Sequence, residues 1–350
     1  MVTAVNPFFT RRDYCNFLFV SQINYTITYL ADRLKRVSHD VVNRYLQQDR
    51  VSARTIWNSV KDEIKKSDEA SLIFDDSVLD KRHSKHIDST RMQWSGNAKK
   101  PIKGIGLVSC IYYNPKTDEH WLIDYRIYDP DVDGKTKLDH MKEMISNAIE
   151  HKKIPFKTVL MDTWYATKDM MMYIDSLDKI FYCPIKSNRS VDDTRGVEKY
   201  KRADSLSWTE EELVKGKIVK LKDFPGDCRV KLFRVPSRIQ KTELIVTNDH
   251  TQESVDQVEQ YCGVRWNIEE YHREIKQTTG IESCQCRKRR IQRNHIGCSL
   301  LLWSTLKSFA RKIGRSIYEI KNGLLDDYMI AELTSPSVNL RFQPVMSYSA

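Results

Sequence analysis

Apolar residues recur at helical spacing through the N-terminal part of the chain. In the segment 29–46 the apolar positions are Leu30, Leu34, Val37, Val41 or Val42, and Tyr45. This spacing predicts helix, because residues three and four apart share one face. The spacing is interrupted near Val37, where Ser38 can cap a second helix.

Two short helices with a cap between them indicate a helix-turn-helix, in which residues 38–46 take the place of the recognition helix. The polar face of that helix holds His39, Asn43 and Arg44, whose side chains can contact bases or phosphates. An ordinary helical hairpin has the same pattern and is the alternative. Given the rest of the chain, we expect residues 1–66 to form a helical region that binds DNA.

From residue 70 the pattern changes to strands that alternate with helices. Apolar runs predict strands at 71–74, 104–114, 119–128, 156–161 and 179–186, with helices at about 136–152 and 165–178. A short polar turn joins the second and third of these strands as a hairpin. The order predicts an α/β fold with a mixed central sheet and flanking helices, whose first part covers residues 67–186.

Residues 187–250 depart from that order. They contain glycines, charged clusters and β-like runs, from which we expect an all-β insertion within the α/β domain. Residues 251–320 have helical spacing again and are expected to complete the core. Residues 321–350 contain two prolines and no clear period, so we expect a C-terminal tail there.

The composition of the chain indicates the kind of partner and the cellular compartment. The formal net charge is +10, from 57 Lys and Arg against 47 Asp and Glu, which favours a polyanionic partner because basic side chains release counterions from phosphates. The N-terminus lacks the apolar stretch of a secretory signal, and the longest apolar run is shorter than the about 20 residues that span a bilayer. We therefore expect a soluble cytoplasmic protein with eight reduced cysteines and no membrane segment.

Two aspartates, Asp76 and Asp162, stand where apolar strands are expected to end. In α/β sheets, ligands bind at the carboxyl ends of strands, so the two side chains are candidates for neighbours in one site. For a single aspartate after a strand, a cap or a turn is the preferred explanation. That explanation weakens when a third acid lies on a helix that faces the same site.

The helix expected over 264–277 carries this third acid. Its buried stripe consists of Val264, Ile268, Tyr271 and Ile275. A second stripe, about a right angle around the helix, consists of Arg265, Glu269, His272 and Lys276. The alternative is a surface ladder of ion pairs, each worth about 0.2–0.5 kcal/mol. Because the second stripe borders the buried face, it suits a cleft better than open solvent.

Carboxylates in this arrangement suit metal-assisted cleavage of phosphodiesters. Two divalent ions about 3.5–4 Å apart can activate a water molecule and stabilise the leaving oxygen. Mg²⁺, for which Mn²⁺ can substitute, prefers carboxylate oxygen and retains several waters. We expect Asp76, Asp162 and Glu269 to hold two such ions, with Arg265 and Lys276 beside them to bind DNA phosphates.

These residues resemble the DDE transposases of bacterial insertion sequences, in particular the group with a Y-R-E-K signature around the third acid. In that signature, two residues separate Tyr from Arg, three separate Arg from Glu, and six separate Glu from Lys. Arg265, Glu269 and Lys276 match the last three positions. Tyr261 departs from the signature, because three residues separate it from Arg265.

The resemblance extends over about residues 70–310. FDDS (74–77) resembles the first-aspartate motif, in which the second Asp is the ligand, and MDTWYA (161–166) resembles the second. Further similar segments are IDYRIYDPDVDGKTKLDH, KSNR, EEYHREIKQTTG and CQCRKRRIQRNH. The resemblance implies a ribonuclease-H-like core, a β-rich insertion between the second Asp and the Glu, and an N-terminal module for the terminal inverted repeats.

Basic residues follow the helix of the third acid. The segment RKRR (287–290) with Arg293 has five basic residues in seven. The default interpretation of such a segment is a solvated charged surface. In an enzyme that acts on DNA, a surface that binds phosphates is the preferred interpretation. Outside the N-terminal region, the residues expected to contact DNA are Tyr261, Arg265, His272, Arg273, Lys276, Arg287, Lys288, Arg289, Arg290 and Arg293.

Two further signals point to metals but are disfavoured. The EF-hand-like string DPDVDG (129–134) lacks the bidentate Glu at its twelfth position, so a turn into a helix is expected there. Cys284, Cys286, His295 and Cys298 are zinc-ligand types, but C-x-C is not the usual spacing and the segment has helical spacing. Reduced thiols are the preferred interpretation.

The leading hypothesis is an insertion-sequence transposase that acts in the bacterial cytosol, associated with the nucleoid. It would bind terminal inverted repeats as a homodimer, hydrolyse the 3′ ends of the element and join them to target DNA. One alternative is a transposase-derived DNA-binding protein without catalysis, which has no need for three acids near phosphate. Another is an unrelated metal-dependent phosphohydrolase with a small substrate, which leaves the basic segments without a purpose.

Overall fold

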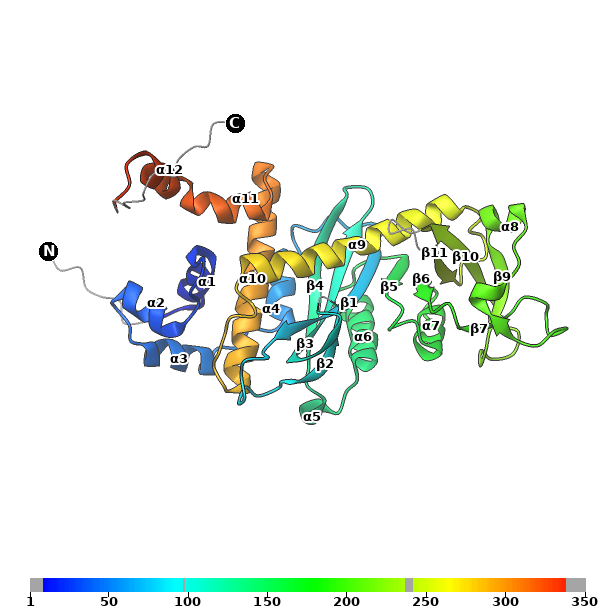
Figure 1. The fold of residues 1–350 in the computed structure, drawn as a ribbon, viewed down its shortest axis with the longest axis horizontal. Helices are drawn as coiled ribbons and strands as arrows, with labels where there is room; N and C mark the ends of the chain where they lie inside the picture. Colours follow the sequence, from blue (N-terminus) through cyan, green and yellow to red (C-terminus); the bar gives the residue numbers. More distant parts are fainter. Residues whose placement is uncertain (1–8, 97, 237–241, 338–350) are drawn as a thin grey trace, which may run out of the picture.

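The computed structural model describes residues 9–96, 98–236 and 242–337 of an elongated molecule (Figure 1). The first three N-terminal helices lie at one end, the sheet with its helices occupies the middle, and the insertion lies at the other end. The long helix α9 (Val255–Thr278) runs from the insertion to the core, where it meets α10 (Arg289–Ile313). Among the described residues, no helix has the length and apolar character needed to span a membrane.

The N-terminal helices are α1 (Arg11–Val20), α2 (Ile27–Leu34), α3 (His39–Gln48) and α4 (Ala53–Val60). Ser38 caps α3, because its hydroxyl accepts a hydrogen bond from the backbone N–H of Val41. The predicted pair of short helices with a cap between them is confirmed. α1, α3 and α4 pack against α10, which attaches this region to the C-terminal part of the core.

The core strands are β1 (Ser71–Asp80), β2 (Arg91–Ser95), β3 (Lys100–Asn114), β4 (Glu119–Tyr128), β5 (Thr158–Met161) and β6 (Ile180–Ile185). β3 pairs antiparallel with β1, β2 and β4, whereas β5 pairs parallel with β1 and β6. The strands therefore follow the order β4-β3-β1-β5-β6. The mixed α/β sheet expected from the sequence is confirmed.

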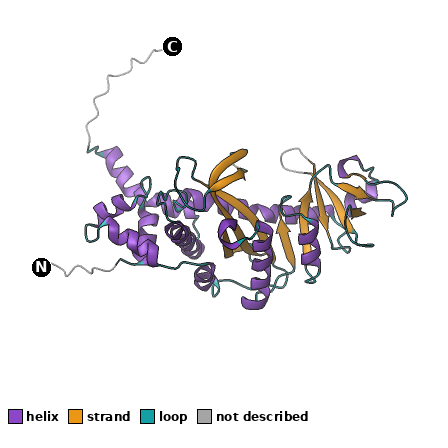
Figure 2. Cartoon of the chain, turned by 90° about the horizontal axis from the view of Figure 1, so that it is seen from below, coloured by secondary structure: helices purple, strands orange, loops and turns teal. Residues whose placement is uncertain are grey.

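Helices cover both faces of this sheet (Figure 2). The elements between β4 and β6 are α5 (Pro130–Asp133), α6 (Lys137–Ser146), a π-helical turn (Asn147–His151) and α7 (Lys168–Asp175). α6 and α7 pack on one face, and α9 and α10 pack on the other. The single turn of α5 leads into α6, as expected for the DPDVDG segment.

β1 is longer than the sequence pattern predicted. The strand was expected to end at Phe74, whereas it continues to Asp80 because β3 pairs with it as far as Gly104. Asp76 therefore lies within the strand and does not follow it. The parallel pairing between β1 and β5 does end at Phe74 and Met161, so the aspartates of both strands come after the last parallel pair.

The insertion continues the core sheet through β11, which pairs antiparallel with β6. Its elements are β7 (Ser190–Asp192), β8 (Lys201–Arg202), a 3₁₀ turn (Ala203–Ser205), α8 (Glu210–Lys215), β9 (Lys217–Leu221), β10 (Val230–Pro236) and β11 (Thr242–Thr247). The prediction of an all-β insertion is wrong, because α8 forms where Thr209 and Glu212 make a capping box.

The expected C-terminal tail contains a helix, α12 (Asp326–Thr334), that the sequence pattern did not predict. After α10 come α11 (Ile317–Asn322), a 3₁₀ turn (Gly323–Leu325) and α12. α12 buries no side chain, and a helix that buries no face needs no apolar stripe to mark it. The remainder of the expected tail, residues 338–350, lies outside the described residues.

Candidate active site

A cleft of about 900 Å³ is lined by residues of β1, β2 and α9. The three acids expected from the sequence, Asp76, Asp162 and Glu269, all line it, and Asp75 lines it as well. Its Lys and Arg side chains are Arg91, Lys137, Arg265, Arg273 and Lys276. Within the described residues, the cleft thus combines four carboxylates with five basic side chains.

β1 directs its two aspartates to opposite faces of the sheet, because successive side chains of a strand alternate. Ile73 belongs to the core on the α9 face, whereas Phe74 belongs to the core on the α6 face. By this alternation Asp75 faces α9 and Asp76 faces α6. Asp75 and Asp162 each come directly after the last parallel pair of β1 and β5. The β1 acid on the same face as the Glu helix is therefore Asp75.

The contacts of the two aspartates agree with this division. Asp76 Oδ2 lies 2.5 Å from Nζ of Lys137 on α6, and Asp76 Oδ1 accepts a hydrogen bond of 3.0 Å from the Tyr165 hydroxyl. Asp75 Oδ2 lies 3.7 Å from Nδ1 of His272 on α9. Both oxygens of Asp76 thus have partners, neither of which belongs to α9.

The turn after β5 holds Asp162 in place. Its Oδ1 accepts hydrogen bonds from the backbone N–H groups of Trp164 at 2.9 Å and Tyr165 at 3.2 Å. Burial raises the pKa of Asp162, the charge of Asp76 raises it further, and the two backbone hydrogen bonds act in the opposite direction.

Burial and mutual repulsion also raise the pKa values of the two acids on the α9 face. For Asp75, burial is the largest cause, followed by the charges of Asp162 and Asp76. For Glu269, burial is again the largest cause and Arg265 opposes it, with 3.5 Å between Nη1 of the arginine and Oε1 of the glutamate. The charge of Asp162 raises the pKa values of both Asp75 and Glu269, so the three carboxylates interact across the cleft.

The chemistry of this donor set fits a hard divalent cation. Carboxylate oxygens are the ligands that Mg²⁺ and Mn²⁺ prefer, and Asp75, Asp162 and Glu269 offer them from three separate elements. In the described ranges, however, no three His, Cys, Asp or Glu side chains are grouped closely enough to hold a metal ion. The acids share a cleft without forming a finished metal site.

The polar stripe of α9 lines the cleft, but its basic residues differ in charge and in their contacts. Burial, with a smaller effect of Lys276, lowers the pKa of His272 to about 3, so this imidazole is neutral at pH 7. Lys276 Nζ donates a hydrogen bond of 2.9 Å to the carbonyl of Val78 and lies 3.2 Å from Oε1 of Glu282. Lys276 therefore connects α9 to β1 as well as facing the cleft.

A family model of the transposase DDE domain matches residues 66–304, which is more than half of the chain. The chain belongs to the DDE transposase family. Comparison with the curated proteins gives no match. Among solved structures, the piggyBac transposase synaptic complex with hairpin DNA resembles this transposase with a TM-score of 0.51 and 11% sequence identity, over 97% of this chain and 76% of that one. At that identity the likeness concerns the fold alone.

Tyr261 of this transposase does not line the cleft. Its ring stacks on that of Tyr182 of β6, with 4.3 Å between the ring centroids and 14° between the planes. One additional residue between Tyr and Arg rotates the Tyr side chain by about 100° around a helix, which accounts for its different position. A DNA contact by Tyr261 stays a prediction.

The basic segment after α9 lies beside the N-terminal helices. Its exposed members are Arg287, Lys288 and Arg290. Lys288 Nζ donates a hydrogen bond of 3.1 Å to Gln47 of α3. Arg289 instead pairs with the buried carboxylate of Asp129, with 2.8 Å between Nε and Oδ2, and Arg293 is half-buried. Three of the five basic side chains predicted to contact DNA are therefore exposed, and one of these, Lys288, already has a partner on α3.

The polar face of α3 continues this basic surface. His39 and Arg44 are exposed and Asn43 is half-buried. Gln47, the partner of Lys288, donates a hydrogen bond of 2.7 Å to Asn43 Oδ1. Through Gln47, the predicted contact residue Asn43 of α3 is linked to Lys288, the N-cap of α10. Contact of these residues with DNA stays a prediction.

The disfavoured zinc site receives no support from the contacts of its histidine. His295 Nδ1 lies 2.9 Å from the Tyr14 hydroxyl, and its Nε2 lies 3.1 Å from the carbonyl of Gly280. Both ring nitrogens therefore have hydrogen-bond partners. All eight cysteines are free thiols.

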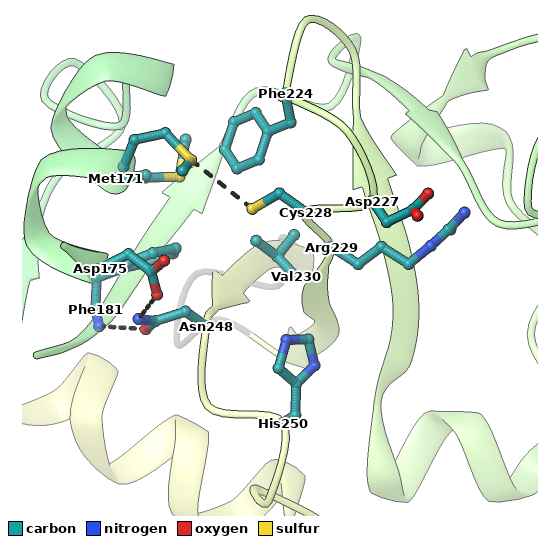
Figure 3. Close-up of a pocket in the computed structure, with 11 residues that line it drawn as sticks. Met171, Asp175, Phe181, Phe224, Asp227, Cys228, Arg229, Val230, Asn248 and His250 are labelled. Atoms are coloured by element: carbon teal, nitrogen blue, oxygen red, sulfur yellow. Dashed lines mark hydrogen bonds between the residues drawn. The ribbon is translucent and has the colours of Figure 1, made fainter. Parts of the chain in front are cut away.

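A second pocket, of about 220 Å³, lies between α7 and the insertion (Figure 3). Asn248 connects the two parts, because it donates a hydrogen bond of 2.7 Å to Asp175 and accepts one of 2.9 Å from the backbone N–H of Phe181. Cys228 Sγ lies 3.7 Å from Sδ of Met172. None of the predicted site residues lines this pocket, which belongs to the joint between insertion and core.

The sequence reasoning missed Lys137 and gave no role to Tyr165. Thr136 and Asp139 form a capping box, a signal from which the position of Lys137 at the start of a helix could have been predicted. Its contact with Asp76 joins residues far apart in the chain, and no local pattern indicates such a contact.

Proposed function

We propose that this protein is an active transposase of an insertion sequence, which binds the terminal inverted repeats, hydrolyses the 3′ ends of the element and transfers them to target DNA. The observation that supports this most directly is one cleft lined by acids from three separate parts of the chain, together with basic side chains. Membership of the DDE transposase family points to the same reaction class, and the proposed core is ribonuclease-H-like.

The metal-binding set of this proposal is Asp75, Asp162 and Glu269, in place of the Asp76 expected from the sequence. Asp75 faces α9, which carries Glu269, whereas both oxygens of Asp76 have other partners. Asp75, Asp162 and Glu269 would hold two Mg²⁺ or Mn²⁺ ions, which would supply activation of a water molecule and stabilisation of the leaving oxygen.

The protein's own side chains bind and orient the DNA strand in the cleft. Arg265 and Arg273 line the cleft from α9, and a guanidinium can contact a phosphate through two parallel hydrogen bonds. His272 contributes no charge at neutral pH, given its lowered pKa. Lys276 holds α9 against β1 through the Val78 carbonyl, which keeps Glu269 and Asp75 on adjoining elements.

The DNA outside the cleft is assigned to the surface formed by α3 and the start of α10. Exposed basic side chains there, such as Arg44, Lys288 and Arg290, suit a phosphate backbone, and α3 takes the place of a recognition helix for the inverted repeats. Two copies of the chain would hold the two ends of the element in a synaptic complex. The protein would act on DNA in the bacterial cytosol.

The proposal is tested by incubating the purified protein with Mg²⁺ and a duplex that contains one end of the element. We expect cleavage at the 3′ end in the wild type and a loss of at least about a thousandfold in Asp162→Asn, since carboxylate ligands hold the metal ions on which the chemistry depends. Asp178→Asn is the matched control, because Asp178 is exposed and has a left-handed backbone conformation that Asn tolerates.

Full activity of a folded Asp162→Asn variant would refute the assignment of the site. Gel-shift binding of the inverted repeats without cleavage in any divalent metal would favour a DNA-binding protein derived from a transposase. Hydrolysis of small phosphodiesters without affinity for DNA would favour a phosphohydrolase of another kind.

A further inference from the structure

Lys137 is a nearly buried ammonium group on the wall of the cleft. It is the first residue of α6, where Thr136 and Asp139 form a capping box, so its backbone position is well defined. Its side chain is only 11% exposed, and its Nζ lies 2.5 Å from Asp76 Oδ2. Few lysines are this buried, and those that are have a charged partner.

Two aromatic rings complete the surroundings of this ammonium. Lys137 Nζ lies 5.4 Å from the ring centroid of Tyr128 and 5.5 Å from that of Trp164. Both rings line the cleft, and Trp164 is 52% exposed. A carboxylate on one side and two ring faces on the others hold the positive charge at the cleft wall.

Asp76 is correspondingly occupied. The Tyr165 hydroxyl donates to its Oδ1 and Lys137 Nζ lies 2.5 Å from its Oδ2, so a metal ion at Asp76 would be repelled by the adjacent ammonium charge. Asp75, in contrast, faces α9, where its Oδ2 lies 3.7 Å from Nδ1 of His272. The cation beside Asp76 thus comes from α6 of the protein itself.

From these contacts we infer that Lys137 contacts a phosphate of the DNA strand in the cleft, and that Asp76 is a positioning residue for Lys137 and not a metal ligand. The inference rests on the proposed function, since it requires DNA in this cleft. An ammonium has three donors and binds phosphate as a point charge. Arg91 of β2, whose Cζ lies 5.3 Å from the ring centroid of Tyr128, is a second cation on this wall. The cations of α9 lie on a different element.

Three variants separate this role from metal binding. Lys137→Met removes the charge and keeps the length of the side chain, and Asp76→Asn removes its partner. Lys135→Met is the matched control, because Lys135 precedes α6, pairs with Glu143 and does not line the cleft. For each variant, Mn²⁺ binding to the free protein is titrated by electron paramagnetic resonance. Affinity for a duplex end is measured without divalent metal at several salt concentrations.

We expect Lys137→Met to retain Mn²⁺ binding. The plot of log affinity against log salt concentration should become less steep by about one, as the loss of one phosphate contact requires. At 0.15 M salt this corresponds to a roughly fivefold weaker complex. Asp76→Asn is expected to retain Mn²⁺ binding as well and to weaken DNA binding through Lys137, so the two changes together have no larger effect than Lys137→Met alone. Lys137→Arg is expected to restore the slope.

An unchanged salt slope in Lys137→Met, or a loss of Mn²⁺ binding in Asp76→Asn, would overturn the inference. If the single variants do not fold because one buried charge is left without its partner, the double variant removes both charges and supplies the same measurement of the slope. Asp162→Asn and Glu269→Gln separate a failure of the proposed metal site from a failure of the inference about Lys137. If both variants retain full Mn²⁺ binding, the proposed metal site is wrong, whatever the result for Lys137.

Discussion

Removal of the Tyr165 hydroxyl tests the partners of Asp76 most directly. In Tyr165→Phe the ring keeps its place in the core, where it is fully buried and lies edge-on to Trp164 with 4.9 Å between centroids. The change removes only the hydrogen bond of 3.0 Å to Asp76 Oδ1. Because the acceptor is a carboxylate in a nearly buried ion pair, little water can replace the lost donor.

Hydrogen bonds to charged groups contribute about 1.5–3 kcal/mol, and neutral ones about 0.5–1.5 kcal/mol. We therefore expect Tyr165→Phe to lower the free energy of unfolding by about 1.5–3 kcal/mol, measured by urea denaturation with an unchanged m-value. With an unfolding entropy of about 2.1 cal/mol/K per residue and 350 residues, this corresponds to a decrease in Tm of about 2–4 °C.

Tyr173→Phe is the comparison that decides the interpretation. Tyr173 has neutral partners, the Ser146 hydroxyl at 3.0 Å and the Lys142 carbonyl at 3.3 Å, so its loss is expected to be smaller. If Tyr165→Phe lowers the free energy of unfolding by no more than Tyr173→Phe does, or if its effect is unchanged in an Asp76→Asn background, the hydroxyl does not stabilise the pair of Asp76 and Lys137. Unchanged Mn²⁺ affinity in Tyr165→Phe is a further expectation, since Asp76 is not assigned to the metal.

Three other outcomes follow from the burial of particular side chains. Burial lowers the pKa of His272 in the folded protein to about 3, whereas the unfolded value is about 6.5. As the pH decreases between these values, the unfolded state binds the proton first and the free energy of unfolding falls. In denaturation curves, a His272→Gln variant should therefore lose less stability between pH 6 and 4 than the wild type. The raised pKa of Asp75 means that its charge destabilises the metal-free fold when the pH is above its unfolded-state pKa of about 3.9. Asp75→Asn should therefore raise Tm at pH 7 but not near pH 3. The same variant should abolish Mn²⁺ binding. Ile268 is fully buried beside Glu269, and Ile268→Ala should cost about 2–5 kcal/mol in urea denaturation; a cost below 1 kcal/mol would mean that α9 is not packed as described.

Much of the fold could be predicted because its helices and strands have one buried and one polar face. α9 is the clearest case, since Ile268, Tyr271 and Ile275 are all fully buried at the spacing the sequence indicated. The strand β1 could not be placed as well, because both of its faces are buried and its sequence shows no alternation. Without alternation, the sequence could not tell which of Asp75 and Asp76 faces α9.

Contacts between distant segments limited the prediction of the site. The basic character of RKRR was readable, but the pairing of Arg289 with Asp129 depends on how two segments 160 residues apart in the chain meet. Arg265, Glu269 and Lys276, which match the family signature, all line the cleft, and their roles there stay predictions. The signature gave no indication of Lys137, whose neighbour Asp76 belongs to another element.

The uninterrupted course of α9 links the insertion mechanically to the chemistry. The helix has 24 residues, a length of about 36 Å at 1.5 Å per residue. Its first part packs on β10 of the insertion, and its later part packs on β1 and bears Glu269. Asp75 belongs to β1 and Asp162 directly follows β5, so the placement of α9 on the sheet sets how far Glu269 lies from them. The helix that brings Glu269 to the cleft is thus also the helix on which the insertion packs.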